Sequence, residues 1–177
     1  MLKPNRSIVV GILLCAAVGV APARAEMLQF STPDGIKAWP KLPDIPDWHQ
    51  DQESSLRLTA NSLIPDGVDP ATAEVTIQAR GFSRINNSLS QMLERDRTAA
   101  PGAQVKKMQD VADKDGVLFN LYSFTPSGAG SWKAMAYSEE GDTLLAFTLS
   151  ARSHTVYESN LPIFVGLIQK YAKDIPW

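Results

Sequence analysis

The chain has 177 residues, of which 44% are hydrophobic and 20% are charged, and its 17 basic residues nearly balance 19 acidic ones. This composition is typical of a globular protein with one domain, and it excludes a fibre or a repeat array. The chain contains no basic run. Because nucleic-acid binding depends on neutralising phosphates, a nucleic acid is excluded as the expected partner.

Residues 1–25 have the layout of a secretory signal peptide. Lys3 and Arg6 give a positive start, an apolar stretch of 13 residues follows, and Ala23-Arg24-Ala25 offers a small-x-small cleavage site. We therefore expect cleavage after Ala25 and a periplasmic or secreted protein without a transmembrane segment. That product would keep 14 basic and 19 acidic residues, a formal charge of −5. A permanent membrane anchor is the alternative interpretation of the same stretch.

Cys15 is the only cysteine, and it lies in the predicted leader. The exported product would therefore have no disulfide, no cysteine zinc site and no thiol nucleophile. A lipoprotein modified at Cys15 is a second alternative, but Leu14 occupies the preceding position, where lipoprotein signals use a small residue.

Residues 26–47 are predicted to form an extended, proline-rich segment in front of the domain. Pro40, Pro43 and Pro46 recur at every third residue, which is the repeat of a polyproline II helix. On such a helix four apolar side chains share one edge: Trp39, Leu42, Ile45 and Trp48. Two interpretations of this apolar strip stay open, since it can pack along its own domain or dock on a protein partner.

Alternation of apolar and polar residues predicts strands in the first half of the domain. Leu56, Leu58 and Ala60 alternate with polar residues and indicate a strand over 54–60. A cleaner alternation over 74–80 indicates a second strand that ends at Gly81. The spacing then becomes helical and predicts a helix over 88–97 that is capped by Asn87 or Ser88.

The second half of the chain returns to strand patterns and ends with a helix. These elements are strands at 104–111, 117–124, 132–137 and 144–151, a closing helix that begins near Thr155 or Asn160, and a short tail at 174–177. Turn residues at 139–142 join two of these strands, and such short connections require antiparallel pairing. The predicted fold class is α+β: a single domain over residues 48–173 with a central antiparallel sheet flanked by helices.

Several features of the sequence coincide with a known pattern of elements. They are Trp48-His49, a strand that ends in Ala79-Arg80-Gly81-Phe82, the helix near residue 90, Asp115-Gly116-Val117 followed by Phe119, the hairpin and the closing helix. Over roughly residues 46–173 this order resembles the PsbP/Mog/DcrB superfamily, whose α/β/α sandwich places an antiparallel sheet between helices. The resemblance implies an exported bacterial member that binds a partner or assists an assembly, with no catalytic residue and no cofactor. A photosynthetic role is not implied, because the specialised N-terminal segments of the photosystem members are not matched.

A search for catalytic and metal-binding patterns finds little. His49 and His154 are the only histidines, and their separation makes a zinc site improbable. A Ser-His-Asp site would have to use His154 with Ser131 or Ser153 and an acid such as Asp142. Two acidic clusters, Asp110/Asp113/Asp115 and Glu139/Glu140/Asp142, are interpreted as solvated turns. The first lacks the ligand spacing of a calcium loop, and a glycosidase with paired carboxylates stays open as an alternative.

We therefore expect a non-enzymatic, periplasmic domain that binds a protein or assists envelope assembly. The apolar strip is the first candidate contact surface. Phe82 and Arg84, at the end of a predicted strand, are the second, since an aromatic residue and an arginine are typical interface residues; Phe82 can also be a core residue. A small exported hydrolase, and an inhibitor or immunity protein, are the alternative functions.

Overall fold

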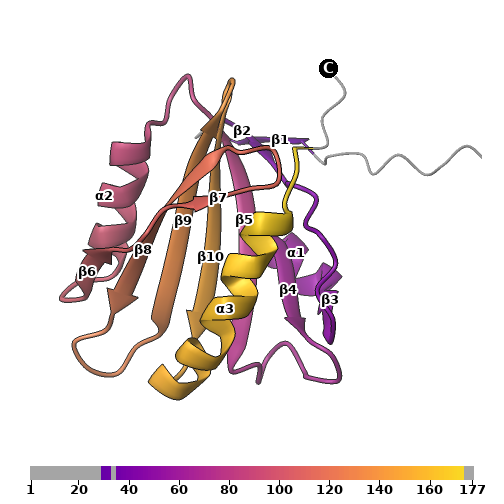
Figure 1. Cartoon of the computed structure of the whole chain (residues 1–177), viewed down its shortest axis with the longest axis vertical. Helices are drawn as coiled ribbons and strands as arrows, with labels where there is room; N and C mark the ends of the chain where they lie inside the picture. The colour runs from indigo at the N-terminus through magenta and orange to yellow at the C-terminus, as the bar shows by residue number, and fades with distance from the viewer. Residues whose placement is uncertain (1–28, 33–34, 174–177) are drawn as a thin grey trace, which may run out of the picture.

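A computed structural model describes residues 29–32 and 35–173. The predicted leader, its cleavage site after Ala25, Cys15 and the tail at 174–177 lie outside the described residues. Within the described part, ten strands form one sheet that carries helices on both faces. In Figure 1 the last helix crosses on the viewer's side of the strands, and the second helix stands at the left of the sheet.

Every strand pairing in the sheet is antiparallel. The main order of strands is β1-β2-β5-β10-β9-β8-β6, with β3 and β4 beyond β5 and β7 beside β8. The strands are β1 (Gln29–Thr32), β2 (Gly35–Ala38), β3 (Trp48–Gln50), β4 (Asn61–Pro65), β5 (Val75–Ser83), β6 (Gln104–Lys107), β7 (Val111–Ala112), β8 (Leu118–Thr125), β9 (Trp132–Glu140) and β10 (Thr143–Ala151). The helices are α1 (Gln52–Leu58), α2 (Leu89–Ala99) and α3 (His154–Lys170). The predicted fold class, an antiparallel sheet flanked by helices, is confirmed.

The predicted hairpin forms the centre of the sheet. β9 and β10 pair along nine residues each, and β10 pairs with β5 on its other side. Only Gly141 and Asp142 lie between the two strands, and Gly141 has a φ of +55°. Such a two-residue turn favours glycine because its backbone is left-handed. The short turn fixes the register, so that alternate residues of both strands point to the same face of the sheet.

The larger core lies between the sheet and α3. Its aromatic centre consists of Phe119, Phe147 and Tyr171, with ring centroids 5.0–6.0 Å apart. Phe164, Leu167 and Ile168 of α3 cover these rings and are themselves buried. The apolar alternation predicted for residues 75–79 contributes Val75, Ile77 and Ala79 to this core.

A smaller core lies on the opposite face, under α2. Met92 of this helix packs with Phe82, Phe124, Met135 and Leu144 from four strands. α1 lies on the same face of the sheet, because the Arg80 guanidinium donates a hydrogen bond to the Leu58 carbonyl at 3.2 Å, and Arg80 is in register with Ala146 of this smaller core. Helices therefore cover both faces, as in the α/β/α sandwich that the resemblance implied.

The strand predicted over residues 54–60 is wrong, because residues 52–58 form α1. The side chain of Asp51 caps this helix by accepting a hydrogen bond from the Ser54 N–H at 2.7 Å. Ser55 is fully buried, and its hydroxyl oxygen accepts a hydrogen bond from the Ser62 N–H, whereas Leu56 is 60% exposed. The alternation of leucines therefore did not mark a buried face.

The start of the closing helix was also predicted too late. Ser153 is its N-cap and accepts a hydrogen bond from the Val156 N–H at 3.3 Å, so neither Thr155 nor Asn160 begins the helix. Pro162 lies inside α3 rather than in its first turn. Its side chain is exposed, and at such a position water can reach the backbone carbonyl that proline leaves without a helical partner.

The proline-rich segment is not separate from the domain. β1 and β2 pair with each other, and Lys37 and Ala38 of β2 pair with Phe82 and Gly81 of β5. Residues 39–47 then run down the right-hand side of Figure 1 to β3. Part of the segment predicted at 26–47 thus belongs to the sheet. Pairing between β4 and β5 stops at Ala79, so the backbone groups of β5 beyond Ala79 are available to β2.

Candidate functional site

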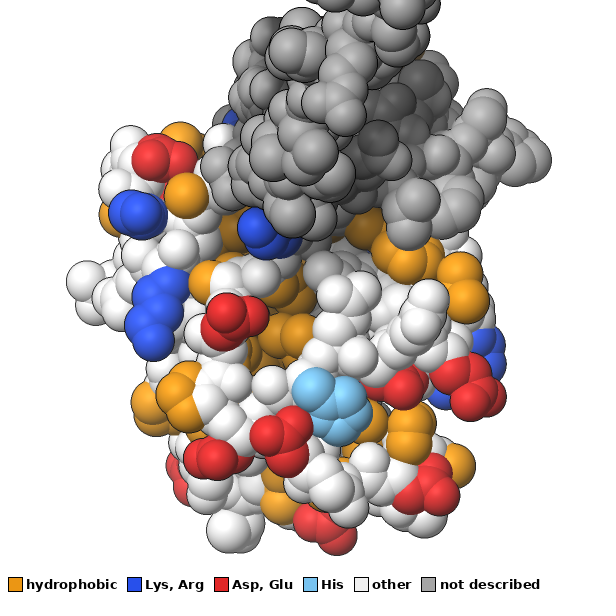
Figure 2. All heavy atoms as spheres, turned by 90° about the vertical axis from the view of Figure 1, so that its right-hand side faces the viewer, with side chains coloured by type: hydrophobic (Ala, Val, Ile, Leu, Met, Phe, Trp, Pro, Cys, Tyr) orange, Lys and Arg blue, Asp and Glu red, His pale blue; other side chains and the backbone are white. Residues whose placement is uncertain are grey.

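The apolar strip packs on its own domain. Trp39 and Leu42 are buried, and Ile45 and Trp48 are half-buried against the core under α3. The neighbouring edge, with Lys41 among its residues, is exposed. Figure 2 shows this side of the molecule, where apolar side chains lie in a hollow that acidic, basic and histidine side chains surround. The interpretation as a partner-binding strip is therefore corrected: these four side chains contribute to the core.

The second candidate surface divides into one buried and one exposed residue. Phe82 is buried in the core under α2, so it is not a contact residue. Arg84 follows the end of β5 and lies on the surface. Its position makes the connection between β5 and α2 the candidate functional site. We call residues 84–87 the β5–α2 loop.

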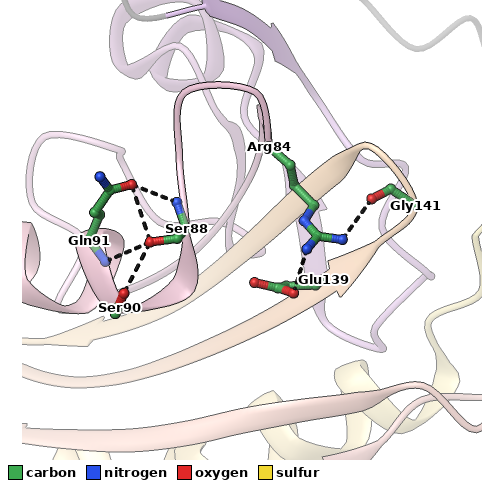
Figure 3. Close-up of polar contacts among 6 residues, drawn as sticks. All are labelled: Arg84, Ser88, Ser90, Gln91, Glu139 and Gly141. Carbon is green, nitrogen blue, oxygen red and sulfur yellow. Dashed lines mark hydrogen bonds and ion pairs between the residues drawn. The ribbon is translucent and has the colours of Figure 1, made fainter.

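Arg84 holds the start of the β5–α2 loop against the β9–β10 turn (Figure 3). Its guanidinium donates a hydrogen bond to the Gly141 carbonyl at 3.0 Å and forms an ion pair with Glu139 at 2.9 Å. Its backbone N–H donates to the Asp142 carbonyl at 2.9 Å. These contacts join residues almost 60 positions apart in the chain, so the loop start is fixed by tertiary structure.

The end of the loop is fixed by local hydrogen bonds. Asn87 is buried, and its side-chain amide donates to the Ser83 carbonyl at 2.8 Å. Ser88 begins α2 with a capping box: its hydroxyl accepts from the Gln91 N–H, and the Gln91 side chain accepts from the Ser88 N–H at 2.9 Å. The cap predicted at Asn87 or Ser88 is thus Ser88, and Asn87 closes the loop behind it.

Ile85 is the residue that the sequence analysis missed. It is 88% exposed, more than Leu56 at 60% or Leu118 at 59%, the other exposed large apolar residues of the described part. Its neighbours Arg84 and Asn86 are also exposed. An isoleucine outside any periodic pattern, between a strand and a helix cap, was the available signal. The β5–α2 loop therefore presents one bare apolar side chain on a fixed backbone.

The two acidic clusters are not simply solvated turns. Glu140 and Asp113 are buried, although they come from different clusters, and Lys173 Nζ lies 3.8 Å from the Glu140 carboxylate. Asp113 accepts hydrogen bonds from the N–H groups of Asp115 and Val117, and Asp115 accepts one from the Lys173 N–H at 3.2 Å. This Glu140 cluster, Asp113, Asp115, Glu140 and Lys173, joins the end of α3 to two turns of the sheet.

The environment of Glu140 disfavours its charged form. Its side chain is 3% exposed, and neither carboxylate oxygen accepts a hydrogen bond within the described residues. Lys173 Nζ is 3.8 Å from Oε2 and donates to the Glu140 backbone carbonyl at 3.2 Å. Burial raises the pKa of Glu140 above its usual value, and Asp113 and Asp115 raise it further, against the opposite effect of Lys173.

The histidines do not form the arrangement that a serine hydrolase requires. His154 and Asp142 lie at opposite ends of β10, and the Ser153 hydroxyl oxygen accepts the capping hydrogen bond of α3. His154 instead pairs with Glu158 at 3.3 Å and packs against Trp132, with 4.3 Å between ring centroids and 48° between the ring planes. No serine hydroxyl bonds to His154 within residues 29–32 and 35–173. His49 pairs with Asp66 at 2.8 Å on the surface.

The described residues contain no group of three or more histidine, cysteine, aspartate or glutamate side chains placed to hold a metal ion. None of the described helices has the length and hydropathy needed to cross a membrane.

Comparison with known proteins gives similarity at the level of fold. No protein-family model matches the sequence, and no curated protein matches it. PA94 of Pseudomonas aeruginosa, a protein of unknown function, superposes with a TM-score of 0.51 at 16% identity, over 85% of this chain and 99% of that chain. LpqN of Mycobacterium tuberculosis, which is involved in cell envelope biogenesis, matches with a TM-score of 0.47 at 16% identity, over 73% and 79%.

A PsbP protein is also among the similar structures. CyanoP of Synechocystis sp. PCC 6803 matches with a TM-score of 0.41 at 13% identity, over 87% of this chain and 95% of that chain. The antiparallel sheet between helices that the resemblance to the PsbP/Mog/DcrB superfamily implied is present in the structure itself. At these identities no residue role is transferred to this chain.

Proposed function

We propose that this chain is an exported, non-enzymatic accessory domain of the bacterial envelope that binds a protein partner through the β5–α2 loop. The observation that carries the proposal is Ile85, whose side chain is 88% exposed on a loop held by hydrogen bonds and an ion pair. The predicted leader at residues 1–25 supports export. The acidic charge of the expected product supports a protein partner rather than a nucleic acid.

The fixed backbone of the loop favours binding. A segment that is ordered before association loses little conformational entropy on complex formation, so more of the contact energy appears as affinity. Arg84 already has its guanidinium engaged with Glu139 and Gly141, which limits the side-chain freedom that a partner would have to restrict. An exposed apolar side chain surrounded by polar groups has the arrangement of an interface centre with a polar rim.

The proposal is tested with the purified protein as bait for envelope and secreted proteins of the source bacterium. The wild type is compared with Ile85→Asp, and Leu56→Asp serves as the matched control because Leu56 is exposed on another element. The affinity of any captured partner is then measured with purified components. Burial of an isoleucine contributes about 1.5–3 kcal/mol, so Ile85→Asp should weaken binding by about tenfold or more.

Two results would count against the proposal. One is a partner that binds Ile85→Asp as tightly as it binds the wild type, or a partner whose binding is lost only in Leu56→Asp. The other is turnover of a substrate that Ile85→Asp leaves unchanged. Both variants place a charge at an exposed position, so their thermal unfolding should match that of the wild type and separate a binding defect from a folding defect.

A further inference from the structure

One stretch of the sheet surface between α1 and α2 is polar and partly open to solvent. α1 packs on β4 and α2 on β9, and β5 and β10 lie between these two strands. In Figure 1 α2 stands to the left of β9, β10 and β5, and α1 lies to their right. The half of β5 and β10 that is remote from the β9–β10 turn places four half-buried polar residues on this face, which we call the polar floor: Thr76, Gln78, Thr148 and Ser150.

Two cations border the polar floor. Arg80 follows Gln78 on the same face of β5, and Lys133 of β9 is in register with Ser150. Arg80 uses one nitrogen, Nη2, to donate to the Leu58 carbonyl at 3.2 Å and to the Gln78 side chain at 3.4 Å. Within residues 29–32 and 35–173, neither Arg80 nor Lys133 forms an ion pair with a carboxylate.

Both cations have donors that a ligand can reach. Arg80 Nε is buried, but Arg80 Nη1 and Lys133 Nζ are not, and neither of these two atoms makes a hydrogen bond to the described residues. Burial of the Arg80 side chain lowers its pKa, so an anion at Nη1 would stabilise the charged form. Hydrogen bonds between a guanidinium or ammonium and a carboxylate are among the strong ones in proteins.

The acid whose charge acts on both cations is already engaged. Asp96 of α2 is near enough to feel Arg80 and Lys133, but its carboxyl accepts a hydrogen bond from the Tyr137 hydroxyl. Burial raises the pKa of Asp96, which makes it a weaker counter-ion than an exposed acid. Two cations thus share one half-buried acid, and the polar floor is a positive region on a chain with more acidic than basic residues.

The space above the polar floor suits an extended segment better than a helix. Neighbouring strands lie about 4.8 Å apart, so β4 and β9 are separated by three strand spacings, or about 14 Å. A third helix between α1 and α2 would need about 16–20 Å between their axes, because packed helices lie about 8–10 Å apart.

We propose that the polar floor binds an acidic segment of a protein partner in an extended conformation. One carboxylate of the segment accepts a hydrogen bond from Arg80 Nη1, and a second pairs with Lys133. The hydroxyls of Thr148 and Ser150 are available to the main chain between these two carboxylates. This surface does not include Ile85, so the inference does not rest on the function proposed for the β5–α2 loop.

The test titrates the purified protein with a short, capped peptide that alternates glutamate and serine. The comparison probes are the same peptide with glutamine in place of glutamate, and inorganic phosphate. Binding is followed by the shifts of backbone amide resonances in nuclear magnetic resonance spectra. We expect saturable shifts centred on residues 76–80, 133–135 and 148–150, which weaken as salt screens the charges. The glutamate peptide should bind about tenfold or more tightly than either comparison probe, because only it brings two carboxylates to two cations.

Lys133→Gln removes one cation and no contact within the described residues. It should weaken binding of the glutamate peptide about threefold or more, whereas the matched control Lys170→Gln, an exposed lysine of α3 on the other face, should not change it. Arg80→Gln should weaken binding about tenfold, and its thermal unfolding reports separately on the loss of the Leu58 contact.

Four results would overturn the proposal. They are equal binding of the glutamate and glutamine peptides, equal binding of inorganic phosphate, shifts that centre elsewhere, and a Lys133→Gln variant that binds as the wild type does. The first three are measured on the wild type, so a variant that fails to fold does not affect them. Ile85→Asp should bind the glutamate peptide as tightly as the wild type does, which keeps this test separate from that of the β5–α2 loop.

Discussion

Replacing Glu140 with glutamine should stabilise the protein at neutral and alkaline pH. The side chain is 3% exposed, its oxygens accept no hydrogen bond within the described residues, and Lys173 Nζ is 3.8 Å away. A carboxylate in this position loses its hydration and recovers only part of the loss from Lys173. Glutamine has nearly the same shape and carries no charge, so Glu140→Gln removes the cost of burying the charge and keeps the packing.

The size of the effect follows from the surroundings of Glu140. Replacing both members of a buried ion pair with apolar residues can stabilise a protein by about 1–4 kcal/mol, whereas removing one member costs about 3–5 kcal/mol because it leaves an uncompensated buried charge. Glu140→Gln leaves Lys173 as a partly solvated charge rather than a fully buried one, so we expect a gain of about 1 kcal/mol, the lower end of the first range. Since the Lys173 side chain is 20% exposed, water can replace part of that interaction. For a domain of this size the gain corresponds to an increase in Tm of about 2–4 °C.

The pH dependence gives the sharper test. Because the pKa of Glu140 is raised in the folded protein, its contribution to stability is fully present below the unfolded value of 4.5 and is lost as the pH rises through the folded pKa. Glutamine does not ionise. The free energies of unfolding of wild type and Glu140→Gln should therefore be closest at acidic pH, and the variant should gain a growing advantage as the pH rises.

Urea unfolding at several pH values, from acidic to about pH 8, measures this difference if the m-value is unchanged. Glu139→Gln is the matched control, because Glu139 is the preceding residue, faces the other side of β9 and is exposed. Loss of its surface ion pair with Arg84 should cost less than about 1 kcal/mol, without the rising advantage. The reasoning is refuted if Glu140→Gln is less stable than the wild type at about pH 8, or if their difference is independent of pH.

Three further substitutions test the core, the α2 cap and the polar contact under α2. Phe147→Ala should lower the free energy of unfolding by about 3–5 kcal/mol, because Phe147 is fully buried between Phe119 and Tyr171; a loss below about 1 kcal/mol in calorimetry would contradict this packing. Ser88→Ala should cost about 1 kcal/mol in urea unfolding by removing the capping box, and Ser88→Asp should restore most of it. Tyr137→Phe should lower the free energy of unfolding by about 1–3 kcal/mol, because the Tyr137 hydroxyl donates to Asp96 at 2.5 Å and burial raises the pKa of that carboxyl. An unchanged Tm would show that water replaces the hydroxyl.

The sequence by itself determined the class of fold and most of its elements. The alternation in residues 75–79, the short turn at Gly141 and the cap at Ser88 each depend on neighbours within a few residues, and each was predicted. Local patterns report these features because side-chain direction repeats every 2 residues in a strand and every 3.6 in a helix. The three-residue repeat from Trp39 likewise gave the correct buried edge.

Tertiary structure decided what each of these elements contacts. The leucines near residue 56 alternate as in a strand, yet a hydrogen bond between Ser55 and Ser62 places the serine in the interior and Leu56 in water. Glu140 and Asp113 belong to separate acidic runs and meet only because the sheet and α3 bring their turns together. The β5–α2 loop is fixed by Arg84 contacts to a turn more than 50 residues later. Periodicity identifies the buried side of an element, whereas register and the packing of distant elements determine which groups meet there.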